Sequence, residues 1–444
     1  MDADHWGIEQ EEQSQSPLAS VLQYGTSSNP VLKQAAIIYG ATTDVLTLEV
    51  ARSASAPTAY FAAFLTAMQQ KGKHSADSLA ALCYLMARIY PMVPNSVLCL
   101  KAGETADLFV DILKRHAEVV YITKNLLFCL AKNLRALGAN DMKSLCSPAA
   151  IKMLRTLLVF SVDPRPKIRR DAQKNSSIFF RHMASTKETL PKPVWEAVVA
   201  FVENELANCS RKDCQTALHL CGLLKDVVQY LPTTAVAKIV APLLQLAAEG
   251  NPYLVLQTFN VLSCLFYSGF HISRVLAVPG AQATALAGSL GLSVTDINTR
   301  ISRDAEFIEN VLVSISDLKP NHNDISGSAA FANAFKTGFA ALYLLSPPKA
   351  LNRANAIFDL LADSFSADKP QVAMSAANAL RAFVKTLINK DTAAAALIDA
   401  KHVIHSIVQR VMDLFNIRLR PAWLQSLAVA QATVYACPTP ASVA

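Results

Sequence analysis

The feature that most constrains the fold of this chain is a helical pattern that proline-containing turns interrupt at regular intervals. Between these turns, apolar residues recur at spacings of three and four, which predicts amphipathic helices. No stretch alternates polar and apolar residues convincingly as a half-buried strand does. We expect helices at residues 30–41, 57–71, 76–90, 104–116, 120–137, 148–160, 165–184, 192–208, 213–230, 233–248, 252–268, 299–317, 328–345, 350–365, 369–389, 398–415 and 421–435.

The turns repeat with a period of forty-odd residues. Leu190-Pro191 begins one predicted helix pair, and Leu231-Pro232 begins the next pair 41 residues later. Asp163-Pro164 and Asn251-Pro252 each precede a second helix and lie 88 residues apart, which is two steps of 44. Helix pairs at this period are typical of HEAT and armadillo arrays, in which neighbouring pairs bury one another's apolar faces. The predicted fold is therefore all-α, an α-solenoid of stacked HEAT/armadillo-like helix pairs.

Composition agrees with a helical array. The chain is 52% hydrophobic, and only 17% of its residues are charged, below the roughly 25% usual for soluble domains. Much of the surface must therefore be neutral or covered by partners. The longest apolar stretch, residues 256–270, contains Gln257, Asn260 and Ser268 and falls short of the ~20 apolar residues that span a bilayer. No membrane-spanning helix is predicted.

The pattern also predicts how the chain is divided. Residues 1–16 carry five acids and no Lys or Arg, and we expect a disordered acidic tail there. We expect one HEAT-like solenoid segment over 17–270 and a second over 298–436. Residues 271–297 contain three glycines and a weak helical signal, which predicts an irregular or loop-rich segment. Residues 437–444 are a short tail.

The predicted helix at 165–184 carries the strongest charge signal. Six basic side chains accompany one acid, Asp171, over residues 165–181, in a chain whose total net charge is +7. A turn aspartate, an apolar-Arg pair and a small residue three positions later form the pattern of the second helix of a HEAT repeat. We assign these ladder positions to Asp163, Ile168, Arg169 and Ala172. The candidate contacts to RNA or to an acidic partner are Arg165, Lys167, Arg170, Lys174 and Arg181. A solvated helix face is the alternative interpretation.

No other constellation indicates chemistry. Cys209, Cys214, His219 and Cys221 lack the short spacings of structural zinc sites, and buried core thiols are the favoured interpretation. The chain has no glycine-rich phosphate loop, no nucleophile elbow and no zinc-protease motif. The sequence therefore predicts no catalytic residue, no cofactor, no metal and no small-molecule substrate, and the chain is not expected to be an enzyme. Isolated cysteines within apolar helices and the absence of a signal peptide indicate a reducing compartment.

Two blocks resemble a known family. VDPRPKIRRDAQ (Val162–Gln173) and NPYLVLQTFNVLSCLF (Asn251–Phe266) are similar to helices of the ribosomal RNA-processing protein twelve family, nucleolar HEAT-repeat proteins of small-subunit ribosome assembly. The matching positions include Arg165, Pro166, Lys167, Arg169 and Arg170, whereas Asp171 stands where a further base is common. The family's chains are much longer, so we expect this chain to correspond to their N-terminal part.

The resemblance implies a non-enzymatic scaffold of ribosome biogenesis. Such a scaffold would contact pre-ribosomal RNA and ribosome assembly proteins during small-subunit (pre-40S) maturation, in the nucleolus and nucleus, with shuttling to the cytoplasm. Two alternatives stay open from the residues alone. One is a karyopherin-like transport adaptor, against which the positive charge argues, and the other is a protein–protein scaffold of an enzyme complex.

Overall fold

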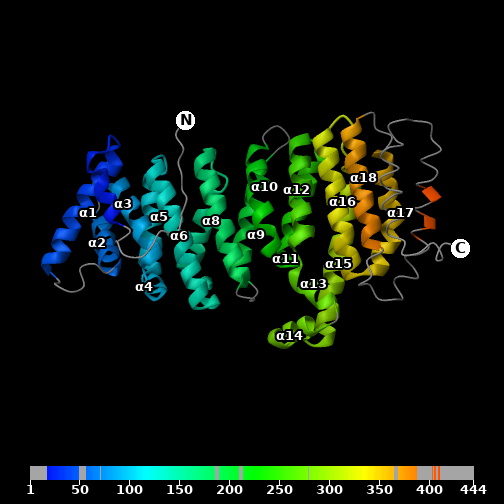
Figure 1. The fold of residues 1–444 in the computed structure, drawn as a ribbon, viewed down its shortest axis with the longest axis horizontal. Helices are drawn as coiled ribbons and strands as arrows, with labels where there is room; N and C mark the ends of the chain where they lie inside the picture. The colour runs from blue at the N-terminus through cyan, green and yellow to red at the C-terminus, as the bar shows by residue number, and fades with distance from the viewer. Residues whose placement is uncertain are drawn as a thin grey trace. The chain divides into compact units, whose positions relative to one another are not determined.

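The computed structural model describes residues 18–49, 57–70, 72–185, 190–209, 214–278, 280–364 and 369–387, with 403, 405–406 and 409–410. All regular secondary structure in these residues is helical, which confirms the predicted all-α class (Figure 1). The helices are η1 (Ala19–Thr26), α1 (Pro30–Glu49), α2 (Pro57–Gln69), α3 (Ala76–Ile89), η2 (Tyr90–Met92), α4 (Asn95–Leu100), α5 (Ala102–Arg115), α6 (Val120–Asn140), η3 (Met142–Cys146), α7 (Pro148–Phe160), α8 (Pro166–Ser185), α9 (Lys192–Ala207), α10 (Gln215–Val227), η4 (Val228–Tyr230), α11 (Thr233–Ala248), α12 (Pro252–Ser268), α13 (His271–Ala277), α14 (Ala281–Leu290), α15 (Val294–Ser316), α16 (Ile325–Leu345), α17 (Pro347–Asp363) and α18 (Pro370–Leu387).

The proline signals act at helix N-termini. Pro148 and Pro252 are the first residues of α7 and α12, where the missing N–H is not needed for a helical hydrogen bond. Ser147 and Asn251 precede them and accept hydrogen bonds from backbone N–H groups of the first turn. These caps explain why the spacing of the X-Pro pairs predicts the helix starts.

The chain forms two compact units, residues 1–194 and residues 195–444. In the first unit, α1, α3, α6 and α8 pack side by side in sequence order, and α5 packs against α7 (Figure 1). We name the set α1, α3, α6 and α8 layer B of this unit, and the set α2, α5 and α7 layer A. The helices of layer A each contact helices of layer B, so the apolar core lies between the two layers.

The second unit repeats this arrangement on its own. Its layer B consists of α10, α12, α16 and α18, which pack in that order, and its layer A consists of α11, α15 and α17. Gly338 of α16 permits the close approach of layer B to its neighbours, because a Cβ atom there would lie 2.7 Å from Leu312 Cδ2 and 3.0 Å from the Phe266 ring. Aromatic side chains fill this core, including Phe259, Phe331, Phe335 and Phe339.

Contacts between successive helix pairs reveal the repeat length. Asp107 and Lys152 form an ion pair across 45 residues, and Glu309 and Arg353 form another across 44. The Tyr343 hydroxyl donates to the Leu387 carbonyl, again across 44 residues. A constant separation of forty-odd residues means that equivalent positions of neighbouring repeats touch. The predicted α-solenoid of stacked helix pairs is confirmed.

Residues 271–297 differ from the loop-rich segment expected there. They contain α13 and α14, and α14 extends away from the other helices of its unit (Figure 1). No residue of α14 is buried. Its apolar residues therefore do not follow the helical period that core-facing residues give to the other helices. The division into segments at 17–270 and 298–436 stays a prediction. The tails at 1–16 and 437–444 and the helix expected at 421–435 lie outside the described residues, as does most of the helix expected at 398–415.

No single helix in the described part of the chain is long and apolar enough to cross a membrane. The pair α12 and α13 reaches that length and composition together, with a bend of 42° between them.

Candidate functional site

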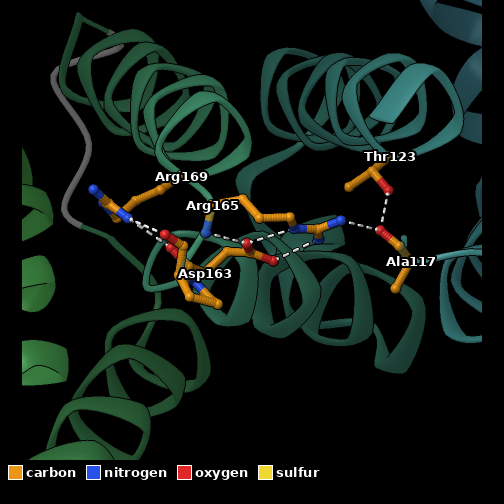
Figure 2. Close-up of polar contacts among 6 residues, drawn as sticks. Ala117, Thr123, Asp163, Arg165 and Arg169 are labelled. Atoms are coloured by element: carbon orange, nitrogen blue, oxygen red, sulfur yellow. Dashed lines mark hydrogen bonds and ion pairs between the residues drawn. The ribbon is translucent and has the colours of Figure 1, made fainter. Parts of the chain in front are cut away.

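The turn between α7 and α8 fixes the start of the basic helix, α8, against the preceding repeat (Figure 2). Asp163 Oδ1 accepts hydrogen bonds from the Arg165 backbone N–H at 2.8 Å and from its Nε at 2.9 Å, while Oδ2 accepts from Nη2 at 2.7 Å. The remaining terminal nitrogen, Nη1, donates to the Ala117 carbonyl at 2.6 Å, and Thr123 Oγ1 donates to the same oxygen. Arg165 thereby ties the α7–α8 turn to the α5–α6 turn of the preceding repeat.

Electrostatics favour this arrangement. Partial burial acts to raise the pKa of Asp163, but the hydrogen bonds and charge of Arg165, helped by Arg169, outweigh it and hold that pKa below its usual value. The same hydrogen bonds with Asp163 raise the pKa of Arg165. Since three guanidinium nitrogens of Arg165 are bonded within the fold, contact with RNA by this side chain would require these bonds to break.

The other three ladder positions are internal. Ile168 is 1% exposed and Ala172 is fully buried, so both face the interior of the repeat stack. Arg169 Nη1 donates to the carbonyl oxygens of Asp163 and Pro164 at 2.8 and 3.1 Å, which are backbone groups of the turn just before its own helix. Arg169 therefore closes the α7–α8 turn, whereas Arg165 reaches the neighbouring repeat.

The remaining candidate contacts form an exposed stripe on α8. Lys167, Arg170, Lys174 and Arg181 are all exposed. Asp171 lies on the side of α8 toward α6, where its carboxylate is 3.7 Å from Lys124 Nζ. Among the residues that the structure describes, no carboxylate lies within ion-pair distance of Arg170, Lys174 or Arg181. Arg170, Lys174 and Arg181 are thus three exposed cations on one helix that no carboxylate of the described residues pairs with.

Helix α6 extends this positive surface. It contributes Lys124, Lys132 and Arg135 and contains no acidic residue. Its contacts with α8 run in the same order along both helices, with Lys124 near Asp171 and Gly138 packed against Met183, so the two helices are parallel neighbours. Sequence reasoning missed these α6 cations because each is isolated within an apolar helix. The signal that could have found them is the absence of any acid over residues 120–140.

Layer A handles its charges differently. In the first unit, Asp107 of α5 pairs with Lys152 of α7 at 2.6 Å, and Asp111 pairs with Arg115 at 2.9 Å. In the second unit, Glu309 of α15 pairs with both Lys349 and Arg353 of α17. Asp107, Asp111 and Glu309 of layer A are therefore each paired with a base, and Asp107 and Glu309 reach bases of the next repeat. In layer B, α16 and α18 of the second unit also carry Lys and Arg without any acid: Lys336, Arg381 and Lys385.

The cysteine cluster is part of the core and of its edges. Cys214 and Cys221 are buried, and burial raises the pKa of the Cys221 thiol to about 12. The Asn251 side chain donates to Cys214 Sγ at 3.0 Å, and His219 Nε2 is 2.7 Å from Gln215 Nε2. In the described part of the chain, no group of three His, Cys, Asp or Glu residues has the geometry to hold a metal ion.

The stacked helix pairs define an α-solenoid of the HEAT class, which presents its helix faces to partners. The family described as RRP12-like, N-terminal HEAT repeats, matches residues 5–269, and the chain belongs to that family. The predicted resemblance is thus confirmed, and no enzyme family is indicated.

Relatives with the same description are found in vertebrates. The RRP12-like protein of Homo sapiens is 25% identical over 379 residues, which cover 83% of this chain and 26% of the relative. The RRP12-like protein of Gallus gallus is 22% identical over 377 residues, with the same coverage. The chain spans about a quarter of the length of these relatives. Among solved structures, the Kap95:Nup1 complex is similar at 12% identity and a TM-score of 0.37, covering 95% of this chain and 57% of that one.

Proposed function

We propose that the chain acts as a non-enzymatic scaffold in ribosome biogenesis. It binds pre-ribosomal RNA and assembly proteins during small-subunit maturation, in the nucleolus and nucleus, and accompanies the particle toward export. Membership of the RRP12-like family, shared with the vertebrate RRP12-like proteins, supports the choice of process. The observation that carries the choice of RNA as ligand is the row of exposed cations Arg170, Lys174 and Arg181 on α8, none of which has a carboxylate within ion-pair distance among the described residues, whereas Asp107 and Lys152 of layer A pair with each other.

The proposed chemistry is phosphate recognition without base readout. Lys167, Arg170, Lys174 and Arg181 neutralise backbone phosphates and release the counterions condensed on them, which favours binding at low salt. Both aromatic side chains of α8, Phe179 and Phe180, are buried, so α8 offers no base-stacking surface beside its cations. Layer B thus supplies affinity and position, while partner proteins or RNA shape supply selectivity.

A charge-reversal series tests this proposal. The variant K167E/R170E/K174E is compared with the layer A variant K114E/K152E/R155E, which changes the net charge by the same amount. Fluorescence anisotropy with a labelled fragment of precursor small-subunit ribosomal RNA should show at least tenfold weaker binding for the layer B variant alone. Equal loss in both variants would reduce the effect to net charge, and no loss in either would contradict RNA binding by layer B. Crosslinking in cells, with sequencing of the recovered RNA, then tests whether the ligand is precursor small-subunit RNA.

The karyopherin-like and enzyme-scaffold alternatives predict another result. A transport adaptor for basic cargo needs an acidic binding surface, and layer B has the opposite sign on α6, α16 and α18. A purely protein-binding scaffold would keep its partners in both charge-reversal variants and would recover no RNA above background. These alternatives become the favoured functions only if the RNA experiments show no binding.

A further inference from the structure

Three nitrogen-bearing residues lie on α6 and α8 beside the point where Gly138 of α6 packs against Met183 of α8, and the charges of two of them act on the third. The approach is fixed at Gly138, where a Cβ atom would lie 2.3 Å from Met183 Sδ and 3.3 Å from Leu145 Cδ1. His182 of α8 precedes that methionine in the chain, and Arg135 and Lys132 lie one and two turns before that glycine on α6. We name Lys132, Arg135 and His182 the α6–α8 cation cluster.

Holding Lys132 and Arg135 half-buried costs free energy unless an anion neutralises them. Lys132 and Arg135 are half-buried, and burial lowers the pKa of both side chains, with Arg135 adding to the effect on Lys132. Burial, then the charges of Arg135 and Lys132, lower the pKa of His182. Within the described residues no carboxylate lies within ion-pair distance of any of the three. The fold therefore holds two cations and a histidine together without a partner of opposite sign.

We propose that the α6–α8 cation cluster is a binding site for a single phosphate group, and that in the cell this group belongs to the RNA backbone. The proposal rests on the proposed function and specifies one contact within it. Arg135 offers a planar fork of donors that matches two phosphate oxygens, and Lys132 adds a point charge. His182 donates a third hydrogen bond when protonated.

A polymer explains the surroundings better than a single phosphorylated side chain does. Arg181 is the residue just before His182 on α8, and Lys174 lies two turns earlier on the same helix. Both are exposed, and neither has a carboxylate partner in the described part of the chain. A phosphopeptide brings one dianion and would leave these cations unused. A chain of phosphates engages the cluster and the stripe together, with the half-buried Lys132 and Arg135 fixing the register of the strand.

Histidine titration tests the site in the unmodified protein. Because the neighbouring cations lower the pKa of His182, a phosphate that neutralises them must raise it on binding. Burial and the charges of Arg135 and Lys132 on α6 lower the pKa of His182, and Arg181 is its neighbour on α8. NMR titration of His182, assigned with H182Q, is run alone and with a short RNA duplex, inorganic phosphate or a phosphoserine peptide. A rise in pKa with RNA supports the site, and no rise at saturating RNA overturns it.

Salt dependence separates the site from the wider surface. The variant K132Q/R135Q keeps side-chain volume, and it should reduce the slope of log affinity against log salt by about 1, the value expected for one lost phosphate. An unchanged slope in this variant, with lost binding in K167E/R170E/K174E, refutes the site but leaves RNA binding by layer B intact. Unchanged binding in both variants refutes both. Stronger binding of the phosphoserine peptide than of RNA refutes the assignment to RNA.

Discussion

At the scale of single residues, Arg165 carries the greatest structural responsibility. It joins a carboxylate two residues away to a carbonyl 48 residues away, so one side chain connects two repeats. In the sequence, an arginine that joins two repeats cannot be distinguished from one that contacts nucleic acid, because both occur beside a turn among polar residues. Only the position of Ala117 distinguishes them, and no local pattern reveals a partner at that distance.

The Asp163–Arg165 contact should make stability depend on pH. The folded-state pKa of Asp163 lies below its unfolded value of about 3.9, so its contribution is present above that pH and is lost as the pH falls through the folded pKa. The isosteric variant D163N lacks the charge at every pH. We expect urea denaturation to give a wild-type advantage of about 1–2 kcal/mol at pH 6 that shrinks below pH 4. An advantage independent of pH would contradict an ionic role for Asp163.

Ile168 should tolerate no charge. The variant I168D places a carboxylate at a position that is 1% exposed, where neither water nor a cation is provided, and we expect a loss of at least about 3 kcal/mol in the free energy of unfolding. The matched control is K174D, which introduces the same side chain at an exposed position of the same helix. Calorimetry or chemical denaturation measures both, and similar midpoints for the two variants would show that Ile168 is not in the core.

At the scale of elements, the sequence predicts those helix boundaries that residues close by in the chain determine. Helix α12 begins at Pro252 and ends at Ser268 as expected, because its cap and its apolar period are local signals. Helix α14 escapes recognition because it buries nothing and therefore has no apolar period. The α6 part of the cation cluster escapes as well, since its meaning depends on which helix packs beside it.

Close packing at Gly338 gives an element-scale prediction. The variant G338L drives a side chain toward Leu312 and the Phe266 ring, and overpacking of this kind costs about 1–3 kcal/mol. The control is G288L in α14 of the same unit, where nothing lies within 4 Å of the added Cβ and the helix should gain slightly from the loss of glycine. Thermal unfolding should show a lower midpoint for G338L only. Equal midpoints would mean that α16 can move away from its neighbours at little cost.

At the scale of the whole molecule, charge is divided between the two layers of each unit. Asp107 and Glu309 of layer A pair with bases of the next repeat, whereas α6, α16 and α18 of layer B carry bases and no acid of their own. Exposed pairs of the layer A type contribute about 0–1 kcal/mol each, so they adjust stability only slightly. Under the proposed function, the exposed cations of α8 act together on one polyanion, so their effect on binding exceeds that of single ion pairs on stability.

Salt should therefore separate folding from binding. Between 50 and 200 mM salt, we expect RNA affinity to fall on the order of a hundredfold if layer B neutralises about four phosphates. The thermal midpoint of the free protein should change little over the same range, because its core is apolar and its surface pairs are weak. Parallel anisotropy and calorimetry series measure the two quantities. A midpoint that falls as steeply as the affinity would show that the layer A pairs hold the repeats together.

The position of exposed cations outside the buried core has an evolutionary consequence. The exposed cations of layer B contribute little to folding, so they can be exchanged, shifted along a helix or lost while the buried positions keep the stack intact. A lineage can thus retune its ligand one substitution at a time without passing through an unfolded intermediate. Relatives that share a quarter of their residues with this chain over most of its length can keep one architecture and still differ in the surface that they offer.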